Sequence, residues 1–179
     1  MAGFYTQKIT SGDKTQVTYD YNSYKSMTFT NTHTSAVSIT LYVTSQLGSD
    51  ITDTTINVIG ATAVSSSSVT ISVDNTVPTN DLVLNERIYK SDGTFIGVAT
   101  GWTDASPDTI VFSGGIVNAI ANDDDLYTGT RYTMLKSVEI PAGTALKLEP
   151  SDFEFDNDSY NMYIDSSNAS GYIDIITRY

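Results

Sequence analysis

Apolar and polar residues alternate along most of the chain, which is the pattern of strands with one buried face. Residues 37–44 place Val, Ile, Leu and Val on one face and Ser, Thr and Tyr on the other. Residues 25–31 alternate in the same way, and the polar stretch 31–35 between them predicts an antiparallel hairpin. Residues 4–10 and 16–21 predict a second strand pair.

The serine run 65–68 marks a change to shorter strands and sharper turns. Residues 87–100 predict a hairpin whose turn is Asp92-Gly93, a dipeptide typical of tight hairpins. Residues 116–122 predict one or two helical turns, because two isoleucines stand four positions apart. Other strands are predicted at 69–73, 108–112, 132–139, 146–148, 152–156, 160–164 and 172–179.

The composition favours an all-β protein. Seventeen of the 21 acidic residues are Asp, Ser and Thr are abundant, and good helix formers are scarce. We expect an antiparallel β-sandwich, jelly-roll-like, formed by both chain ends (1–63 and 127–179). Residues 64–126 would form an inserted, small β-barrel-like module.

The net charge and the cysteine content restrict the binding partners and the compartment that we expect. Nine basic against 21 acidic residues give a net charge of −12, which repels nucleic acid and anionic membranes. We therefore expect neither nucleic acid nor membrane as a partner. The chain has no cysteine, no apolar run near the ~18 residues of a membrane span and no evident signal peptide. These features predict a soluble protein made in a reducing cytoplasm.

Little reactive chemistry is available near neutral pH. His33 is the single histidine, and it lies in a turn-like stretch without recognisable triad neighbours. Gly114-Gly115 lacks the Lys and Ser or Thr that follow in a phosphate-binding loop. A glycosidase-like carboxylate pair stays open, since two acids ~5–9 Å apart would suffice. No spacing singles out such a pair.

Two acidic stretches suggest a hard cation such as Ca²⁺. Residues 123–125 are three consecutive Asp, and the alternative is a solvated loop. Residues 152–158 carry four acids spaced by two. A calcium loop of the EF-hand type would need Gly and Glu where Asn157 and Tyr163 stand. A strand with acids outward and phenylalanines inward fits better, although an incidental ion stays possible in principle.

Trp102 and 12 tyrosines admit three interpretations: packing at the core or its edges, contact between subunits, or a platform for sugars. The glycosylation patterns at Asn157 and Asn168 carry little weight without a secretion signal. We assign no catalytic, cofactor-binding or metal-binding residue.

Three stretches of the chain form a combination of motifs: 28–32 leading into 36–43 (TFTNT, AVSITLYV), 131–148 with IPAG at 140–143, and 85–97 (NERIYKSDGTFIG). Together they resemble virion structural proteins of tailed bacteriophages, notably those of marine cyanobacterial phages. The resemblance implies a non-enzymatic particle component without cofactors.

On this resemblance we expect a capsid decoration (cement) protein, or a neck or tail accessory, made in the host cytoplasm and located in the virion. Its partners would be other copies of itself, as in a trimer, and major capsid or neck and tail proteins. The alternative is a host-surface glycan-binding module of a tail or fibre. A β-sandwich hydrolase acting on host polysaccharide is a third hypothesis.

Overall fold

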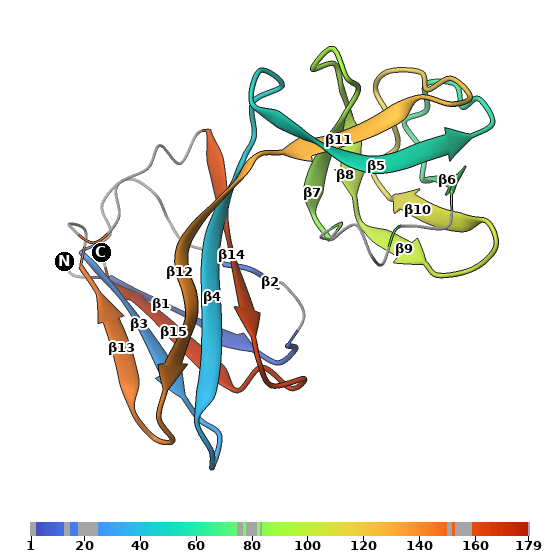
Figure 1. Cartoon of the computed structure of the whole chain (residues 1–179). Helices are drawn as coiled ribbons and strands as arrows, with labels where there is room; N and C mark the ends of the chain where they lie inside the picture. The colour runs from blue at the N-terminus through green and yellow to red at the C-terminus, as the bar shows by residue number, and fades with distance from the viewer. Residues whose placement is uncertain are drawn as a thin grey trace. The chain divides into compact units, whose positions relative to one another are not determined.

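The structure is a computed structural model that describes residues 3–12, 15–17, 25–74, 77, 82, 84–149, 152 and 159–178. These residues form antiparallel β-sheets, and none of them lies in an α-helix, as the composition predicts. The chain divides into two compact units (Figure 1). The first unit is Met1–Thr44 with Arg131–Tyr179, and the second is Ser45–Thr130.

The first unit contains two four-stranded sheets. The first sheet has the order β1-β15-β3-β13, and the second sheet has the order β12-β4-β14-β2. The strands are β1 (Phe4–Ile9), β2 (Thr15–Gln16), β3 (Ser26–Asn31), β4 (Val37–Ser45), β12 (Arg131–Ile140), β13 (Ala145–Leu148), β14 (Tyr160–Ser166) and β15 (Ile173–Arg178).

The strand order is that of a jelly roll. When these eight strands are renumbered within the unit, the first sheet reads 1-8-3-6 and the second reads 5-4-7-2. The first strand therefore pairs with the last, the second with the seventh, the third with the sixth and the fourth with the fifth, in alternate sheets. This winding is characteristic of jelly rolls.

Alternation along both sheets builds one core between them. Each fully buried aliphatic or aromatic side chain contributes about 1.5–3 kcal/mol relative to an exposed one. The buried side chains of this core are Ile9, Val17, Met27, Phe29, Val37, Ile39, Leu41, Val43, Ile140, Leu148, Met162, Ile164, Ile173 and Ile175.

The two hairpins predicted for the first 44 residues are wrong. The strands β3 and β4 lie in different sheets, as do β1 and β2, so each connection crosses the sandwich.

Asn31 stabilises the connection between β3 and β4. Its side chain is fully buried and donates to the carbonyls of Ser35 (2.9 Å) and Ile140 (2.8 Å). Its Oδ1 accepts the His33 N–H (2.8 Å), which holds the chain at the corner.

The second unit is a seven-stranded antiparallel sheet with the order β8-β7-β11-β5-β6-β10-β9. The predicted hairpin around Asp92-Gly93 is confirmed as the β7·β8 pair. β8 and β9 are the two edges, and no pairing between them closes a barrel in the described part of this unit. The strands are β5 (Ile51–Ile59), β6 (Val69–Val73), β7 (Glu86–Tyr89), β8 (Phe95–Ala99), β9 (Gly101–Thr103), β10 (Asp108–Phe112) and β11 (Asp125–Gly129).

The unit boundaries differ from the predicted ones. Residues 45–63 were assigned to the sandwich, yet β5 pairs with β6 and β11 in the second unit. The boundaries fall at 44/45 and 130/131 rather than at 63/64 and 126/127. A strand shows the same alternation of apolar and polar residues in either unit, so the pattern does not report which unit the strand joins.

Two local predictions also differ. The serine run does not mark the start of the second unit, because Ser65 and Ile116 exchange two backbone hydrogen bonds (3.0 and 2.9 Å) inside that unit. The segment 116–122 is not helical, and Ile116 and Ile120 form isolated β-bridges instead. Both isoleucine side chains are buried, each at its own β-bridge, and this explains why two apolar residues stand four positions apart. The strand predicted over 152–156 lies largely outside the described residues.

We expect Asn31→Ala to lower the free energy of unfolding by about 2 kcal/mol, because the buried Ile140 carbonyl loses its donor. Urea unfolding followed by far-UV circular dichroism measures the change. Asn168→Ala is the matched control, since Asn168 accepts one solvent-exposed backbone N–H, that of Ser170 (3.0 Å). Equal losses in both variants would contradict this role of Asn31.

Gly48 lies against Gly93, and a Cβ added to Gly48 would sit 2.1 Å from the Gly93 carbonyl oxygen. The backbone must move to admit it, so Gly48→Ala should destabilise the second unit by about 1–3 kcal/mol. Gly114→Ala is the control, because no atom lies within 4 Å of its added Cβ. Fluorescence of Trp102, the single tryptophan, reports unfolding of this unit. Identical midpoints for the two variants would refute the contact.

Candidate interaction surface

Two neighbouring strands of the first sheet, β1 and β15, form one part of its outer face. Along each strand, every second side chain enters the core. Ile9 and Ile175 are buried, so their neighbours along each strand point outward. The antiparallel register then sets outward residues side by side in three rows. These rows are Phe4 with Arg178, Thr6 with Ile176, and Lys8 with Asp174.

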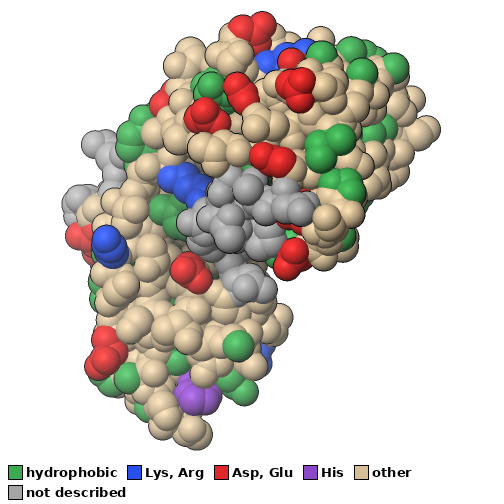
Figure 2. Space-filling view, turned by 45° about the vertical axis from the view of Figure 1, so that its right-hand side comes forward, with side chains coloured by type: hydrophobic (Ala, Val, Ile, Leu, Met, Phe, Trp, Pro, Cys, Tyr) green, Lys and Arg blue, Asp and Glu red, His purple; other side chains and the backbone are tan. Residues whose placement is uncertain are grey.

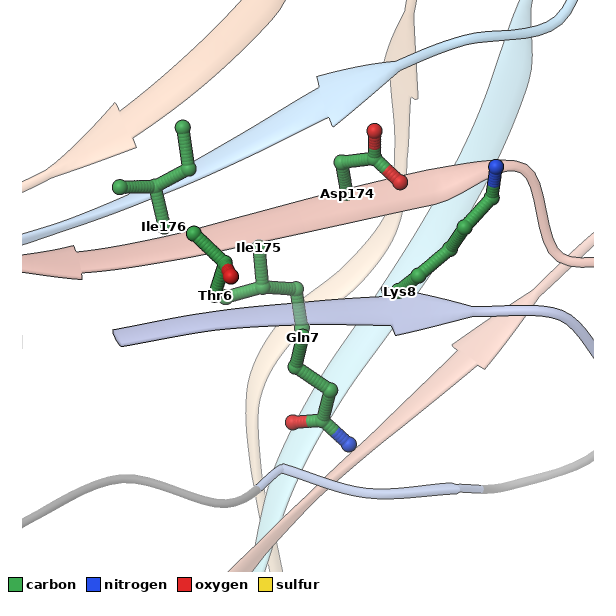
Figure 3. Close-up of a pocket in the computed structure, with 6 residues that line it drawn as sticks. All are labelled: Thr6, Gln7, Lys8, Asp174, Ile175 and Ile176. Carbon is green, nitrogen blue, oxygen red and sulfur yellow. The ribbon is translucent and has the colours of Figure 1, made fainter. Parts of the chain in front are cut away.

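A shallow groove of about 340 Å³ runs along these two strands (Figure 3). Apolar side chains project beside it into solvent: Phe4 is 66% exposed and Ile176 is 40% exposed. The groove is lined by Thr6, Gln7, Lys8, Asp174, Ile175 and Ile176. We give the name β1/β15 face to the six outward residues of the three rows, which are Phe4, Thr6, Lys8, Asp174, Ile176 and Arg178.

The first sheet has more basic than acidic residues, whereas the whole chain has more acidic than basic residues. The four strands of this sheet carry three basic residues, Lys8, Lys147 and Arg178, and one acid, Asp174. Lys147 forms an ion pair with Glu149 just beyond β13. Buried Oδ1 of Asp174 has no hydrogen-bond partner within the described ranges. The β1/β15 face is therefore slightly basic, because it carries Lys8 and Arg178 against Asp174, a net charge of +1.

Trp102, the sequence candidate for a sugar platform, lies on the edge strand β9. Its register partner is Ile110, which is fully buried, so both side chains are on the core side of the sheet. Trp102 is 39% exposed. This placement favours packing at the edge of the core.

Several tyrosines contact other aromatic or cationic groups. Tyr42 and Tyr163 are buried and stacked at 5.5 Å, and the Arg131 guanidinium lies 5.7 Å from the Tyr42 ring. Tyr132 and Tyr160 meet edge to face at 6.0 Å. These pairs support the packing interpretation of the tyrosines within the described ranges.

His33 has a local structural role. Its Nδ1 accepts the Ser35 N–H (3.2 Å), and its ring lies 4.6 Å from the ring of Tyr172. The imidazole thus helps to shape the same corner that Asn31 holds.

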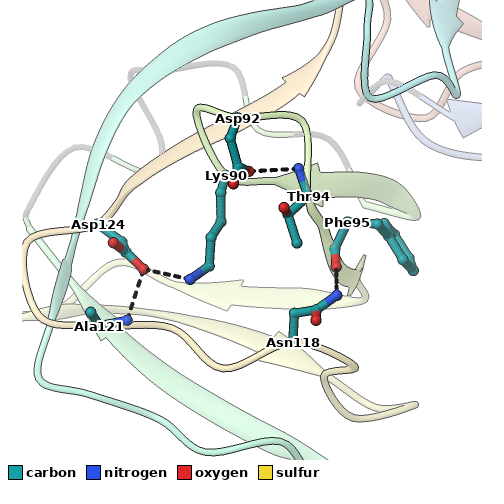
Figure 4. Close-up of polar contacts among 7 residues, drawn as sticks. All are labelled: Lys90, Asp92, Thr94, Phe95, Asn118, Ala121 and Asp124. Atoms are coloured by element: carbon teal, nitrogen blue, oxygen red, sulfur yellow. Dashed lines mark hydrogen bonds and ion pairs between the residues drawn. The ribbon is translucent and has the colours of Figure 1, made fainter.

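Of the aspartate run 123–125, Asp123 and Asp124 lie in the loop that precedes β11, and Asp125 begins that strand (Figure 4). Asp124 accepts the Ala121 N–H (2.8 Å) and forms an ion pair with Lys90 (3.1 Å). The Ala121 hydrogen bond, and then the Lys90 ammonium, hold the pKa of Asp124 below its ordinary value, although burial opposes them. Asp123 has a φ of 63° and makes the turn. This geometry favours the solvated-loop interpretation, because Lys90 already neutralises Asp124.

The second acidic stretch is described at one residue. Asp152 accepts the Glu149 N–H (2.6 Å), and residues 153–158 lie outside the described ranges. Among the residues that are described, no three His, Asp or Glu side chains form a group suited to a metal ion. Nor does any described helix have the length and apolar character needed to span a bilayer.

Acidic side chains are scattered over the face shown in Figure 2 rather than gathered at one place. Sequence reasoning missed the β1/β15 face, because its two strands lie at opposite ends of the chain. The one available signal was the alternation of 172–179, which marks Ile176 as an apolar residue on a polar face.

No protein-family model, curated protein or solved structure matches the chain.

Asp124→Asn should weaken folding at neutral pH by less than about 1 kcal/mol, since the ion pair with Lys90 is partly exposed to solvent. Because the pKa of Asp124 is lower in the folded than in the unfolded chain, its contribution is complete above the ordinary value of 3.8 and is lost as the pH falls below it. The difference between wild type and variant in urea unfolding should shrink from about pH 5 to about pH 2.

Asp123→Asn is the control for that series, because it removes an adjacent charge and Asn tolerates a positive φ. A difference for Asp124→Asn that is constant across this pH range would contradict the assignment.

Proposed function

We propose that the chain is a non-enzymatic structural protein of a bacteriophage particle, which self-associates and docks on the particle as a capsid decoration or a neck or tail accessory. The observation that carries the proposal is the jelly-roll strand order, with a second β-unit inserted between its fourth and fifth strands. Jelly rolls are frequent in viral capsids and in lectins. This support is an analogy of fold, because one fold can host many functions.

The surface of the first unit supports the same role. The β1/β15 face offers exposed aromatic and aliphatic side chains, two cations and a shallow groove. Aromatic residues and Arg are enriched at protein–protein contacts. In a particle, many symmetric copies of a modest contact add up to firm attachment.

The host-surface glycan-binding module is the second candidate. Exposure of Trp102 favours it, because part of an indole ring faces solvent at a sheet edge. The core-side position of the ring limits the area that a sugar would meet.

Sedimentation velocity of the full chain between about 1 and 100 μM tests self-association, a range that brackets weak to moderate affinities. We expect discrete oligomers and no retention on a glycan array. Glycan binding by a protein that stays monomeric, abolished by Trp102→Ala, would overturn the structural role in favour of the second candidate. Turnover of polysaccharide by the purified chain would overturn both.

A further inference from the structure

We propose that the β1/β15 face binds the acidic second unit of another copy of this chain, in a head-to-tail contact. This inference rests on the self-association proposed above and names the two surfaces that meet.

Charge is divided unequally between the two units. The second unit, Ser45–Thr130, holds 11 of the 21 acidic residues and two of the nine basic residues. Its net charge is therefore −9, out of −12 for the chain. The first unit has a net charge of −3 and presents the locally basic β1/β15 face. The basic face and the more acidic unit are thus different parts of the same chain.

The seven-stranded sheet offers a matching surface on β5 and β11. Asp53 is the register partner of Tyr127, and Asp125 lies two residues before Tyr127, so the three share one side. Leu126, between Asp125 and Tyr127, is buried in the core, so this side faces outward. Asp53 and Asp125 are exposed.

The electrostatics of Tyr127 agree with this grouping. Desolvation first, and then the negative charges of Asp53 and Asp125, raise the pKa of the Tyr127 phenol. Ile59, further along β5, adds an apolar side chain that is 50% exposed. Ile59 lies two residues after Asn57, the register partner of Asp125, so it faces the same side as Asp125. The surface therefore combines acids with an apolar residue, as the β1/β15 face combines cations with apolar residues.

Charge decides between the arrangements of two copies. A symmetric contact between two second units would oppose two charges of −9, and one between two β1/β15 faces would oppose two surfaces that each carry Lys8 and Arg178 against one acid, Asp174. A head-to-tail contact opposes unlike charges, which steers association and fixes partner choice. Such a contact is heterologous, so it builds a closed ring or an open chain of copies.

The test is a charge swap between two double variants. Lys8→Glu with Arg178→Glu reverses the β1/β15 face, and Asp53→Lys with Asp125→Lys reverses the second surface. By sedimentation velocity, each variant alone should associate on the order of tenfold or more weakly than wild type. A 1:1 mixture should recover assembly, because every head-to-tail contact in an alternating assembly again joins opposite charges.

Salt gives an independent readout. Wild-type assembly should weaken on the order of tenfold between about 50 and 500 mM NaCl, because exposed charges are screened. Lys136→Glu, an exposed lysine on β12, is the control and should associate like wild type. Circular dichroism establishes that the variants fold. If a reversed face unfolds, Lys8→Gln with Arg178→Gln replaces it, with a smaller loss expected.

The outcomes separate the two proposals. Wild type that is monomeric at every salt concentration would remove the self-association proposed above. Wild type that assembles with no salt dependence, together with reversed variants that assemble equally well alone, would leave that function standing and overturn the head-to-tail contact.

Discussion

The first unit depends on pairing between the two ends of the chain. β1 and β3 pair with β15, β3 also pairs with β13, β4 pairs with β12, and β2 pairs with β14. Each of these pairs joins a strand that begins before residue 45 to a strand that begins after residue 130. Neither end can satisfy its strand edges or bury its apolar face without the other. The sandwich therefore forms only when both ends are present.

This constraint also allows the insertion. β4 and β12 lie side by side as the fourth and fifth strands of the jelly roll, so the chain leaves and re-enters at neighbouring positions. The Ser45 N–H donates to the Thr130 carbonyl (2.9 Å) at that point. The inserted unit has a hydrophobic core of its own, which includes Ile56, Ile88 and Phe112. Insertions are tolerated where the ends of a compact unit are close together.

The same winding creates the surface on which the functional proposals depend. It places β1 at the edge of a sheet, next to the last strand, and so brings Phe4 beside Arg178 and Thr6 beside Ile176. Two side chains of types that often act in catalysis or metal binding have structural roles in this fold: His33 shapes a corner, and Asp124 organises a loop. The surface left for partners is apolar and charged, which suits binding between proteins.

Composition and alternation were enough to predict the all-β class and most strands of both units, because alternation reports which face of a strand is buried. The β7·β8 hairpin was predicted by its Asp92-Gly93 turn. Alternation could not choose strand partners. Backbone hydrogen bonds are the same for every sequence, so β3 was paired with its neighbour β4 when its partners are β13 and β15. The unit boundary at residue 45, the corner at Asn31 and the β1/β15 face were decided by tertiary structure alone, since each depends on contacts between residues far apart in the chain.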